Sequence, residues 1–79
     1  MQQSSRQIDF GRTVRSFRKA AGLSQEMLAR KSGVHRTYVG SIERGEANVT
    51  LATMVRLALA LEVSVADLVS SISVSDSES

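Results

Sequence analysis

The chain has 79 residues, with ten Lys and Arg, eight Asp and Glu, one His and no Cys. This composition excludes disulfides and zinc sites built on Cys or paired His ligands, and we expect no metal and no cofactor. No apolar run approaches the length that spans a bilayer, so we expect a cytoplasmic protein with no membrane partner. A domain this small often needs support from oligomerisation.

Charge is divided unevenly along the chain. Residues 6 to 44 carry nine Lys or Arg against three acidic residues, a net charge of +6, whereas residues 45 to 79 carry one Arg against five acidic residues, a net charge of −4. The basic part predicts a surface for a polyanion. The alternative is an ordinary solvated face that keeps the protein soluble.

Helical spacing of the apolar residues predicts a compact all-α domain of five helices. Residues 1–7 are expected to form a flexible arm. The first helix is expected from about Asp9, an N-cap candidate, to Ala21, with Gly22 as its stop. Its inward stripe is expected to hold Phe10, Val14, Phe17 and Ala21.

Four shorter segments follow. Ser24 is expected to cap a helix over 25–32, and Gly33 to supply the left-handed residue of a tight turn. The third helix is expected from His35 to about Arg44. The last two helices, over 51–61 and from residue 65 onward, have Thr50 and Ser64 as N-caps. The domain is thus expected over 8–72, with a disordered acidic tail over 73–79.

The third helix has two contrasting faces. Tyr38, Val39 and Ile42 fall on one arc of a helical projection, and the polar arc holds Arg36, Thr37, Gly40, Ser41 and Arg44. A glycine inside a helix costs about 1 kcal/mol relative to alanine, and nothing in solvent rewards a missing side chain. We therefore interpret Gly40 as clearance for the close approach of a partner.

The segments GLSQEMLARKSG (22–33) and HRTYVGSIERG (35–45) resemble the helix-turn-helix of the lambda-repressor-like, or XRE-type, DNA-binding proteins. The resemblance extends from Phe10 to about Leu68, with the motif over 25–44. Packing explains its spacing: a small Ala29 lets two helices cross closely, and a glycine makes the turn between them.

Within this family, the wording RTYVGSIERG followed by Asn48, Val49 and Thr50 is similar to the controller proteins of restriction-modification systems. Two residues depart from their pattern. Ala47 stands where those proteins often have an arginine that helps contact DNA, and Glu62 stands where a Gly or Asn often ends the fourth helix.

The resemblance implies that the third helix enters the major groove of double-stranded DNA. Base contacts are then expected from Arg36 and Thr37, with Ser41 a lesser candidate, and Gly40 allows close approach to the groove. The alternative for Arg36 is an exposed residue at a helix start. Phosphate contacts are expected from Ser24, Gln25, His35, Tyr38, Arg44 and Asn48. A helix cap is the alternative for Ser24 and for His35, and a role in shaping the loop is the alternative for Asn48.

Arg18 requires a separate interpretation, because it lies beside Phe17 on the inward stripe. The resemblance implies that it forms a buried structural ion pair with Glu43 rather than a DNA contact. The intact pair need not be strongly stabilising, but loss of one partner would be costly.

The fourth helix is apolar over more than half its circumference, which is more than one core stripe uses. Val55 and Leu59, together with Leu68, Val69 and Ile72, are expected to form a two-fold interface. The alternative is a small core with excess apolar surface. A homodimer would present two recognition helices about 34 Å apart to a pseudo-palindromic operator.

We therefore expect a nucleoid-associated transcriptional regulator, and the resemblance implies autoregulation of a restriction-modification operon. RNA polymerase is left open as a further partner. A phage-type repressor and the antitoxin of a toxin-antitoxin pair use the same motif and stay open. A helical protein-interaction module is the alternative of another class. An enzyme is not expected, because one His, no Cys and no glycine-rich phosphate loop leave little for acid-base or nucleophilic chemistry.

Overall fold

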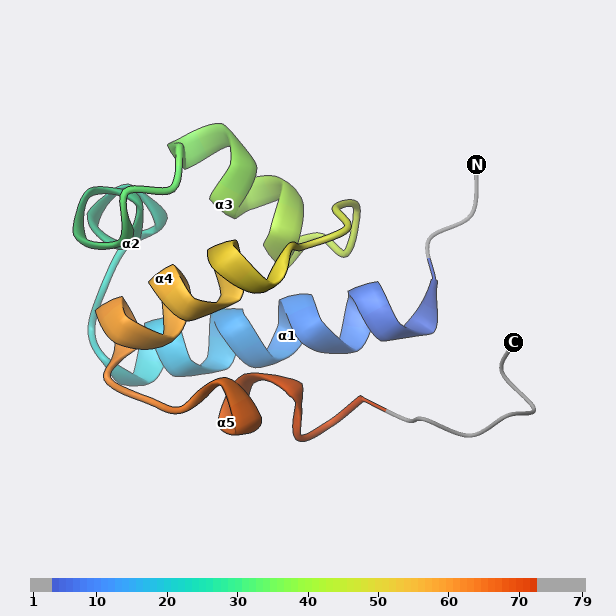
Figure 1. Cartoon of the computed structure of the whole chain (residues 1–79). Coiled ribbons are helices and arrows are strands. Elements are labelled where there is room, and N and C mark those ends of the chain that lie inside the picture. The colour runs from blue at the N-terminus through green and yellow to red at the C-terminus, as the bar shows by residue number, and fades with distance from the viewer. Residues whose placement is uncertain (1–3, 73–79) are drawn as a thin grey trace.

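The computed structural model describes residues 4–72, and this range contains five helices and no strand. The helices are α1 (Ser5–Ala20), α2 (Gln25–Ser32), α3 (Arg36–Glu43), α4 (Leu51–Leu61) and α5 (Val65–Val69) (Figure 1). α1 is central, since it contacts α3, α4 and α5, while α2 packs on α3 and α4. The compact all-α, five-helix fold class predicted from the sequence is confirmed. None of the described helices has the length and apolarity needed to cross a membrane.

α1 begins earlier than expected. Its N-cap is Ser4, which forms a capping box: Ser4 Oγ accepts from the Gln7 backbone N–H at 3.1 Å, and Gln7 Oε1 accepts from the Ser4 backbone N–H at 3.3 Å. This reciprocal pair stabilises a helix whose N-cap lies five residues before Asp9. Residues 5–7 of the expected arm are therefore helical. Residues 1–3 of that arm and the tail over 73–79 lie outside the described residues.

The remaining helix starts are as predicted. Each expected cap side chain accepts a hydrogen bond from a backbone N–H of the first helical turn: Ser24, Thr50 and Ser64. His35, for which a cap was the alternative to a phosphate contact, caps α3. The turn between α2 and α3 contains Gly33 at a φ of 75°. After α4 the chain passes through Glu62 at a φ of 60°, a left-handed conformation that favours glycine or asparagine.

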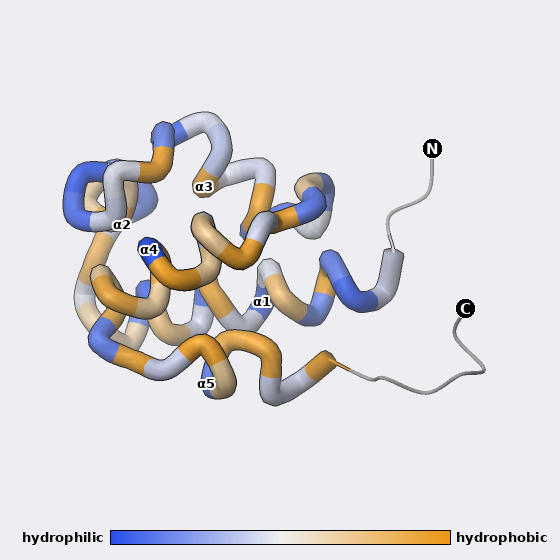
Figure 2. The backbone as a smooth tube through the Cα atoms, in the orientation of Figure 1, coloured by the Kyte–Doolittle hydropathy of each residue, from blue (hydrophilic) through white to orange (hydrophobic). Residues whose placement is uncertain are grey.

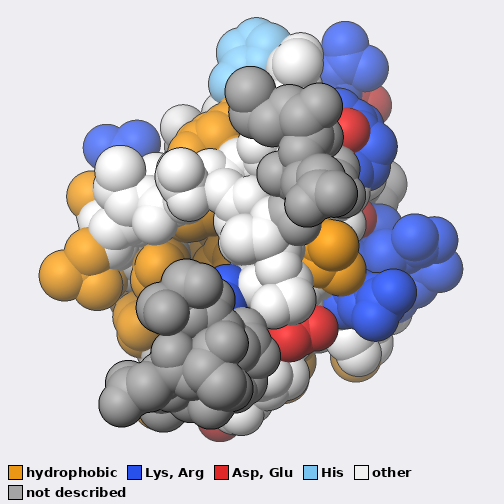
Figure 3. Space-filling view, turned by 90° about the vertical axis from the view of Figure 1, so that its right-hand side faces the viewer, with side chains coloured by type: hydrophobic (Ala, Val, Ile, Leu, Met, Phe, Trp, Pro, Cys, Tyr) orange, Lys and Arg blue, Asp and Glu red, His pale blue; other side chains and the backbone are white. Residues whose placement is uncertain are grey.

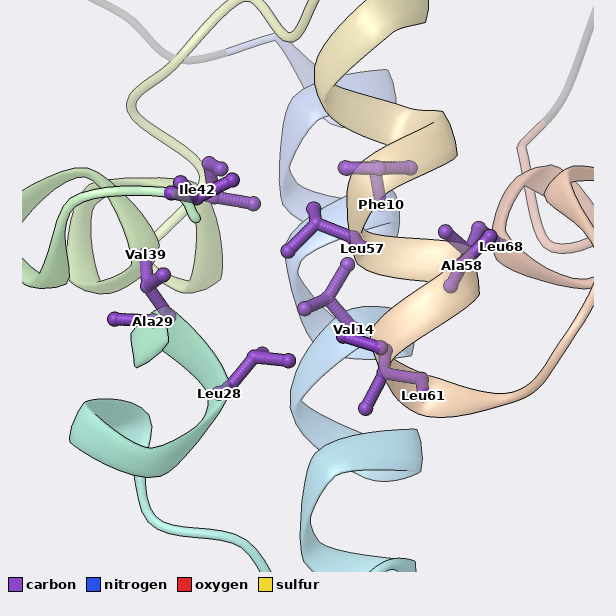
Figure 4. Close-up of a cluster of buried hydrophobic side chains, with 12 residues drawn as sticks. Phe10, Val14, Leu28, Ala29, Val39, Ile42, Leu57, Ala58, Leu61 and Leu68 are labelled. Carbon is purple, nitrogen blue, oxygen red and sulfur yellow. The ribbon is translucent and has the colours of Figure 1, made fainter. Parts of the chain in front are cut away.

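One cluster of buried apolar side chains joins all five helices (Figure 4). Its largest fully buried members are Leu28, Ile42, Leu57, Leu68, Val14 and Val39. α4 contributes strongly, since four of its residues are buried: Leu57, Ala58, Ala60 and Leu61. Hydrophobic colouring runs along much of α4 in Figure 2. Ala21, expected on the inward stripe of α1, is instead exposed, because the helix ends at the preceding residue.

α1 approaches α3 very closely at Gly11. A Cβ added there would fall against the carbonyl oxygen of Ile42 and lie 2.9 Å from that of Glu43. The missing side chain therefore lets the backbone of α1 contact the C-terminal turn of α3. This contact, which was not predicted, fixes the end of α3 against the body of the domain.

Candidate nucleic-acid interface

The turn between α2 and α3 is fixed by local hydrogen bonds. Ser32 Oγ accepts from the Val34 backbone N–H at 3.1 Å and donates to the Ala29 carbonyl oxygen at 3.4 Å. Val34 itself is buried and anchors the turn in the core. The two helices of the motif are thus joined by an ordered connection, which sets the direction in which α3 leaves it.

α3 buries one face and presents the other, as predicted. Val39 and Ile42 are buried in the core, whereas Arg36 and Thr37 are exposed in its first turn. Ser41 is half-buried further along the same side. The three residues expected to read bases therefore lie on the outward side of this helix.

The cap of α3 is His35. It is exposed, and its Nδ1 accepts from the Thr37 backbone N–H at 3.1 Å. The predicted role as a helix start is confirmed, while the predicted phosphate contact stays a prediction. Ser24 is placed in the same way at the start of α2, where its hydroxyl accepts from the Met27 backbone N–H at 3.0 Å.

Gly40 lies at the floor of a surface hollow on the polar side of α3. The hollow is lined by Gln25, Arg36, Thr37, Gly40 and Arg44. A Cβ added at Gly40 would lie 3.1 Å from Arg44 Nη1 and 3.7 Å from Gln25 Oε1. The structure thus gathers two expected base readers and two expected phosphate ligands around one bare stretch of backbone. These two long side chains cover Gly40, which is buried.

A buried ion pair supports this surface from beneath. Arg18 Nε donates to Glu43 Oε2 at 2.7 Å, and Arg18 Nη2 donates to Glu43 Oε1 at 3.0 Å. Arg18 also donates to the Leu23 carbonyl oxygen at 2.8 Å. The hydrogen bond with Glu43 raises the pKa of Arg18 above its ordinary value. The structure therefore contains the Arg18–Glu43 pair that was expected, and it links α1 to the end of α3.

Gln25 belongs to the same network. Its Nε2 donates to Glu43 Oε1 at 3.0 Å, which ties the first residue of α2 to the last residue of α3. The Glu43 side chain is only 3% exposed, so its hydrogen bonds are made away from bulk water. The expected phosphate ligand Gln25 therefore has a structural role in addition, holding the two helices of the motif together.

Tyr38 and Asn48, both expected at phosphates, hold the loop before α4. The Tyr38 hydroxyl donates to the Asn48 carbonyl oxygen at 3.2 Å, and Gln7 Nε2 donates to Asn48 Oδ1 at 2.6 Å. The Tyr38 ring is half-buried against the core, as is Ala47 in the loop. Sequence reasoning missed the Gln7 contact, because it joins residues far apart in the chain.

Charged and apolar side chains gather in different parts of one face of the molecule. Figure 3 shows most of the Lys and Arg side chains of this face on its right, the histidine at the top and most of the apolar side chains on the left. Arg44 is exposed, and its Nη2 lies 3.2 Å from Glu46 Oε1. A separate apolar surface and a separate basic surface are therefore available for different contacts.

The apolar surface lies on α4 and differs in part from the expected interface. Leu51, Val55 and Leu59, spaced one turn apart, are 68%, 41% and 73% exposed. Val69 and Ile72 are half-buried against the core. Leu68 is fully buried and packs α5 onto the domain, so its assignment to the interface was wrong. Leu51 is exposed on the same stripe, four residues from Val55, and was not among the residues expected at the interface.

Comparison with known proteins agrees with this geometry. A helix-turn-helix family model (HTH_3) matches residues 14–68. The control protein C.SmaI of Serratia marcescens is 62% identical over 52 residues, which cover 66% of this chain and 62% of that protein. The match therefore spans less than two thirds of that relative's length.

Solved structures show the same fold. The restriction-modification controller protein C.AhdI from Aeromonas hydrophila matches with a TM-score of 0.77 at 47% identity, covering 78% of this chain and 94% of that chain. SinR of Bacillus subtilis, a master regulator for biofilm formation, was solved in complex with DNA; it matches with a TM-score of 0.73 at 35% identity, over 75% of this chain and 95% of that chain. With more than half of its residues matched by the family model, the chain belongs to the XRE-type helix-turn-helix family.

Proposed function

We propose that this protein is a sequence-specific transcriptional regulator that binds double-stranded DNA with α3 in the major groove. The observation that carries the proposal is the orientation of α3: Val39 and Ile42 are buried, while Arg36 and Thr37 project from its first turn. In helix-turn-helix proteins the N-terminal residues of this helix contact base edges. The similarity to SinR, a protein solved in complex with DNA, supports the same mode of binding.

The exposed side chains differ in what they offer to DNA. The Arg36 guanidinium suits the O6 and N7 acceptors of guanine, and Thr37 offers a hydroxyl and a methyl group to a base edge. Ser41 is half-buried, which limits it to a minor base contact. Gly40 leaves the backbone of α3 uncovered once the side chains above it move, and this allows a close approach to the groove.

A second set of residues would bind phosphates and fix the register of α3 on the duplex. Ser24 and Gln25 lie at the start of α2, where backbone N–H groups and the helix dipole favour an anion. Arg44 and His35 lie at opposite ends of α3. Tyr38 and Asn48 would contribute through the loop that they order.

We propose further that the protein binds as a homodimer through the α4 stripe, defined as Leu51, Val55 and Leu59. Exposed apolar residues one turn apart on a single helix form a self-complementary ridge of the kind that a two-fold interface buries. Val69 and Ile72 would extend this contact at its edge. The dimer would present two copies of α3 about 34 Å apart, which matches half-sites one helical turn apart.

The similarity to the control protein C.SmaI and the controller protein C.AhdI supports a role in a restriction-modification operon. We propose that the protein regulates the promoter of its own operon on the nucleoid. Operator occupancy would set the sign of regulation, with RNA polymerase as the partner when the bound protein activates.

The proposal is tested by selection of binding sites from random DNA at moderate salt. We expect an enriched pseudo-palindrome whose half-sites are centred about one helical turn apart. Selection with Arg36→Ala should lose the base preference at the position that Arg36 reads and retain the half-site spacing. Recovery of no enriched sequence with the wild-type protein would overturn the proposal.

A further inference from the structure

We infer that Glu46 is a positioning residue that restrains Arg44 in the DNA-free protein and competes with phosphate for its guanidinium. The inference rests on the proposed function, because it concerns how the same surface engages DNA. Glu46, which follows Gly45 at the end of α3, would thus lower the affinity for DNA without contacting a base.

The backbone of Glu46 is held in place by the end of α3. The Glu46 N–H donates to the Ser41 carbonyl oxygen at 3.0 Å, and the Gly45 N–H donates to that of Ile42 at 3.0 Å. This pair of bonds is the Schellman arrangement, and it requires the left-handed φ of 78° found at Gly45. The carboxylate of Glu46 therefore starts from a fixed point beside Arg44.

The Arg44 guanidinium lies between Glu46 and Gly40. One amino group, Nη2, is 3.2 Å from Glu46 Oε1. The other, Nη1, is 3.1 Å from the position that a Cβ at Gly40 would take. Glu46 thus holds Arg44 folded back over the bare backbone of α3, across the hollow that Arg36 and Thr37 also line.

Because the Arg44–Glu46 pair is exposed, it contributes little to folding stability, and Arg44 can exchange the carboxylate for a phosphate. The Arg44 and Glu46 side chains are 60% and 44% exposed, and exposed ion pairs contribute little to folding. A carboxylate and a phosphate offer the guanidinium the same kind of charged oxygen acceptor. A phosphate and Glu46 would therefore compete for the same guanidinium charge, and movement of Arg44 toward a phosphate would withdraw one of the two side chains that cover Gly40.

The consequence is a reduction in affinity that does not depend on sequence, because phosphate contacts carry no sequence information. Glu46→Gln removes the competing charge and leaves a side chain of nearly the same shape. We expect this variant to bind both a selected site and a random duplex about two- to fivefold more tightly, the range that an exposed ion pair allows. The slope of log K against log salt should steepen by up to about 0.9, the value of one phosphate contact.

A double-mutant cycle separates competition for Arg44 from simple repulsion of DNA. Wild type, Glu46→Gln, Arg44→Gln and the double variant are titrated by fluorescence anisotropy with both duplexes between about 50 and 200 mM salt. Glu62→Gln, the same charge change at the exposed end of α4, is the matched control. Thermal unfolding of each variant establishes that it is folded.

The expected result is a gain for Glu46→Gln that exceeds the gain for Glu62→Gln and disappears when Arg44 is replaced. A gain of the same size in the absence of Arg44 would overturn the inference, since Glu46 would then act by repulsion alone. Equal affinities of Glu46→Gln and Glu62→Gln would overturn it as well, and would leave the proposed function intact. Failure of the wild-type protein to bind either duplex would overturn both.

Discussion

Replacement by alanine is predicted to have opposite effects on the free energy of unfolding at two glycines inside helices, Gly11 and Gly40. Gly11→Ala and Gly40→Ala each place a methyl group in the interior of a helix, where alanine is intrinsically favoured by about 1 kcal/mol. At Gly11 the new Cβ meets backbone carbonyl groups of α3, the nearest being that of Ile42. At Gly40 it meets the tip of the flexible Arg44 side chain at 3.1 Å.

The magnitudes follow from what has to move. The backbone at the end of α3 cannot yield without disturbing the Arg18–Glu43 pair, and overpacking of this kind costs typically about 1–3 kcal/mol, occasionally more. We expect Gly11→Ala to lower the free energy of unfolding by about 1–3 kcal/mol, a fall in Tm of at least about 4 °C. Gly40→Ala should raise it by up to about 1 kcal/mol, because the tip of the flexible, exposed Arg44 side chain can shift by a few tenths of an ångström.

The assay is urea unfolding followed by far-ultraviolet circular dichroism, with the two variants compared in midpoint and slope. If Gly11→Ala were as stable as the wild-type protein, the close contact of α1 with α3 would not exist as described. DNA titration of Gly40→Ala provides a second measurement. We expect weaker binding in spite of the higher stability, since the methyl group enters the hollow; unchanged affinity would show that Gly40 is merely tolerated.

Three further substitutions, two of them paired with a control variant, test separate parts of the structure. Glu62→Gly should raise the free energy of unfolding by about 1 kcal/mol, because it relieves a left-handed φ; a lower Tm would contradict this. Glu43→Gln should lower the free energy of unfolding by about 3–5 kcal/mol, because Arg18 stays buried without its counter-charge. Glu46→Gln, at an exposed ion pair, should lower it by less than about 1 kcal/mol. Equal losses for the two variants in chemical unfolding would refute this reasoning. Leu59→Lys should shift the protein to a monomer in sedimentation at micromolar concentration. Ser16→Lys, which adds the same charge at an exposed position of α1, should leave the dimer intact. A monomeric wild-type protein would contradict the proposed dimer.

Features set within a few residues could be read from the sequence. The caps Ser24, Thr50 and Ser64 and the turn at Gly33 depend only on neighbouring backbone groups, and all were predicted. The start of α1 depends on equally local bonds, yet its cap was predicted at Asp9 and not at Ser4. The capping box at Ser4 stabilises the earlier start.

Features that depend on how helices distant in the chain pack against one another could not be predicted from the sequence. The burial of Leu68 depends on which side of the short α5 meets α1 and α4, and helical spacing alone leaves that side undetermined. The close contact at Gly11 depends on where α3 ends above α1. The same is true of Asn48, whose partners Gln7 and Tyr38 come from two different helices.

The sequence predicted which residues face outward at the candidate site, but it did not predict how their side chains lie over Gly40. The outward position of Arg36 and Thr37 follows from the two-faced pattern of α3, as does the inward position of Val39. The cover over Gly40 does not follow from that pattern. It arises because the Arg44 and Gln25 side chains lie over Gly40, while Glu46 contacts the same Arg44 guanidinium.

The central claim is that the first turn of α3 reads DNA bases, and the affinity of Arg36→Ala for a selected site tests it most directly. Lys19→Ala, which removes the same charge from an exposed position on α1, is the matched control. We expect Arg36→Ala to lose about 1–3 kcal/mol of binding free energy on the selected site and to discriminate less between bases at one position, while Lys19→Ala retains the wild-type preference. Equal losses for the two variants, with base preference unchanged in both, would contradict the claim.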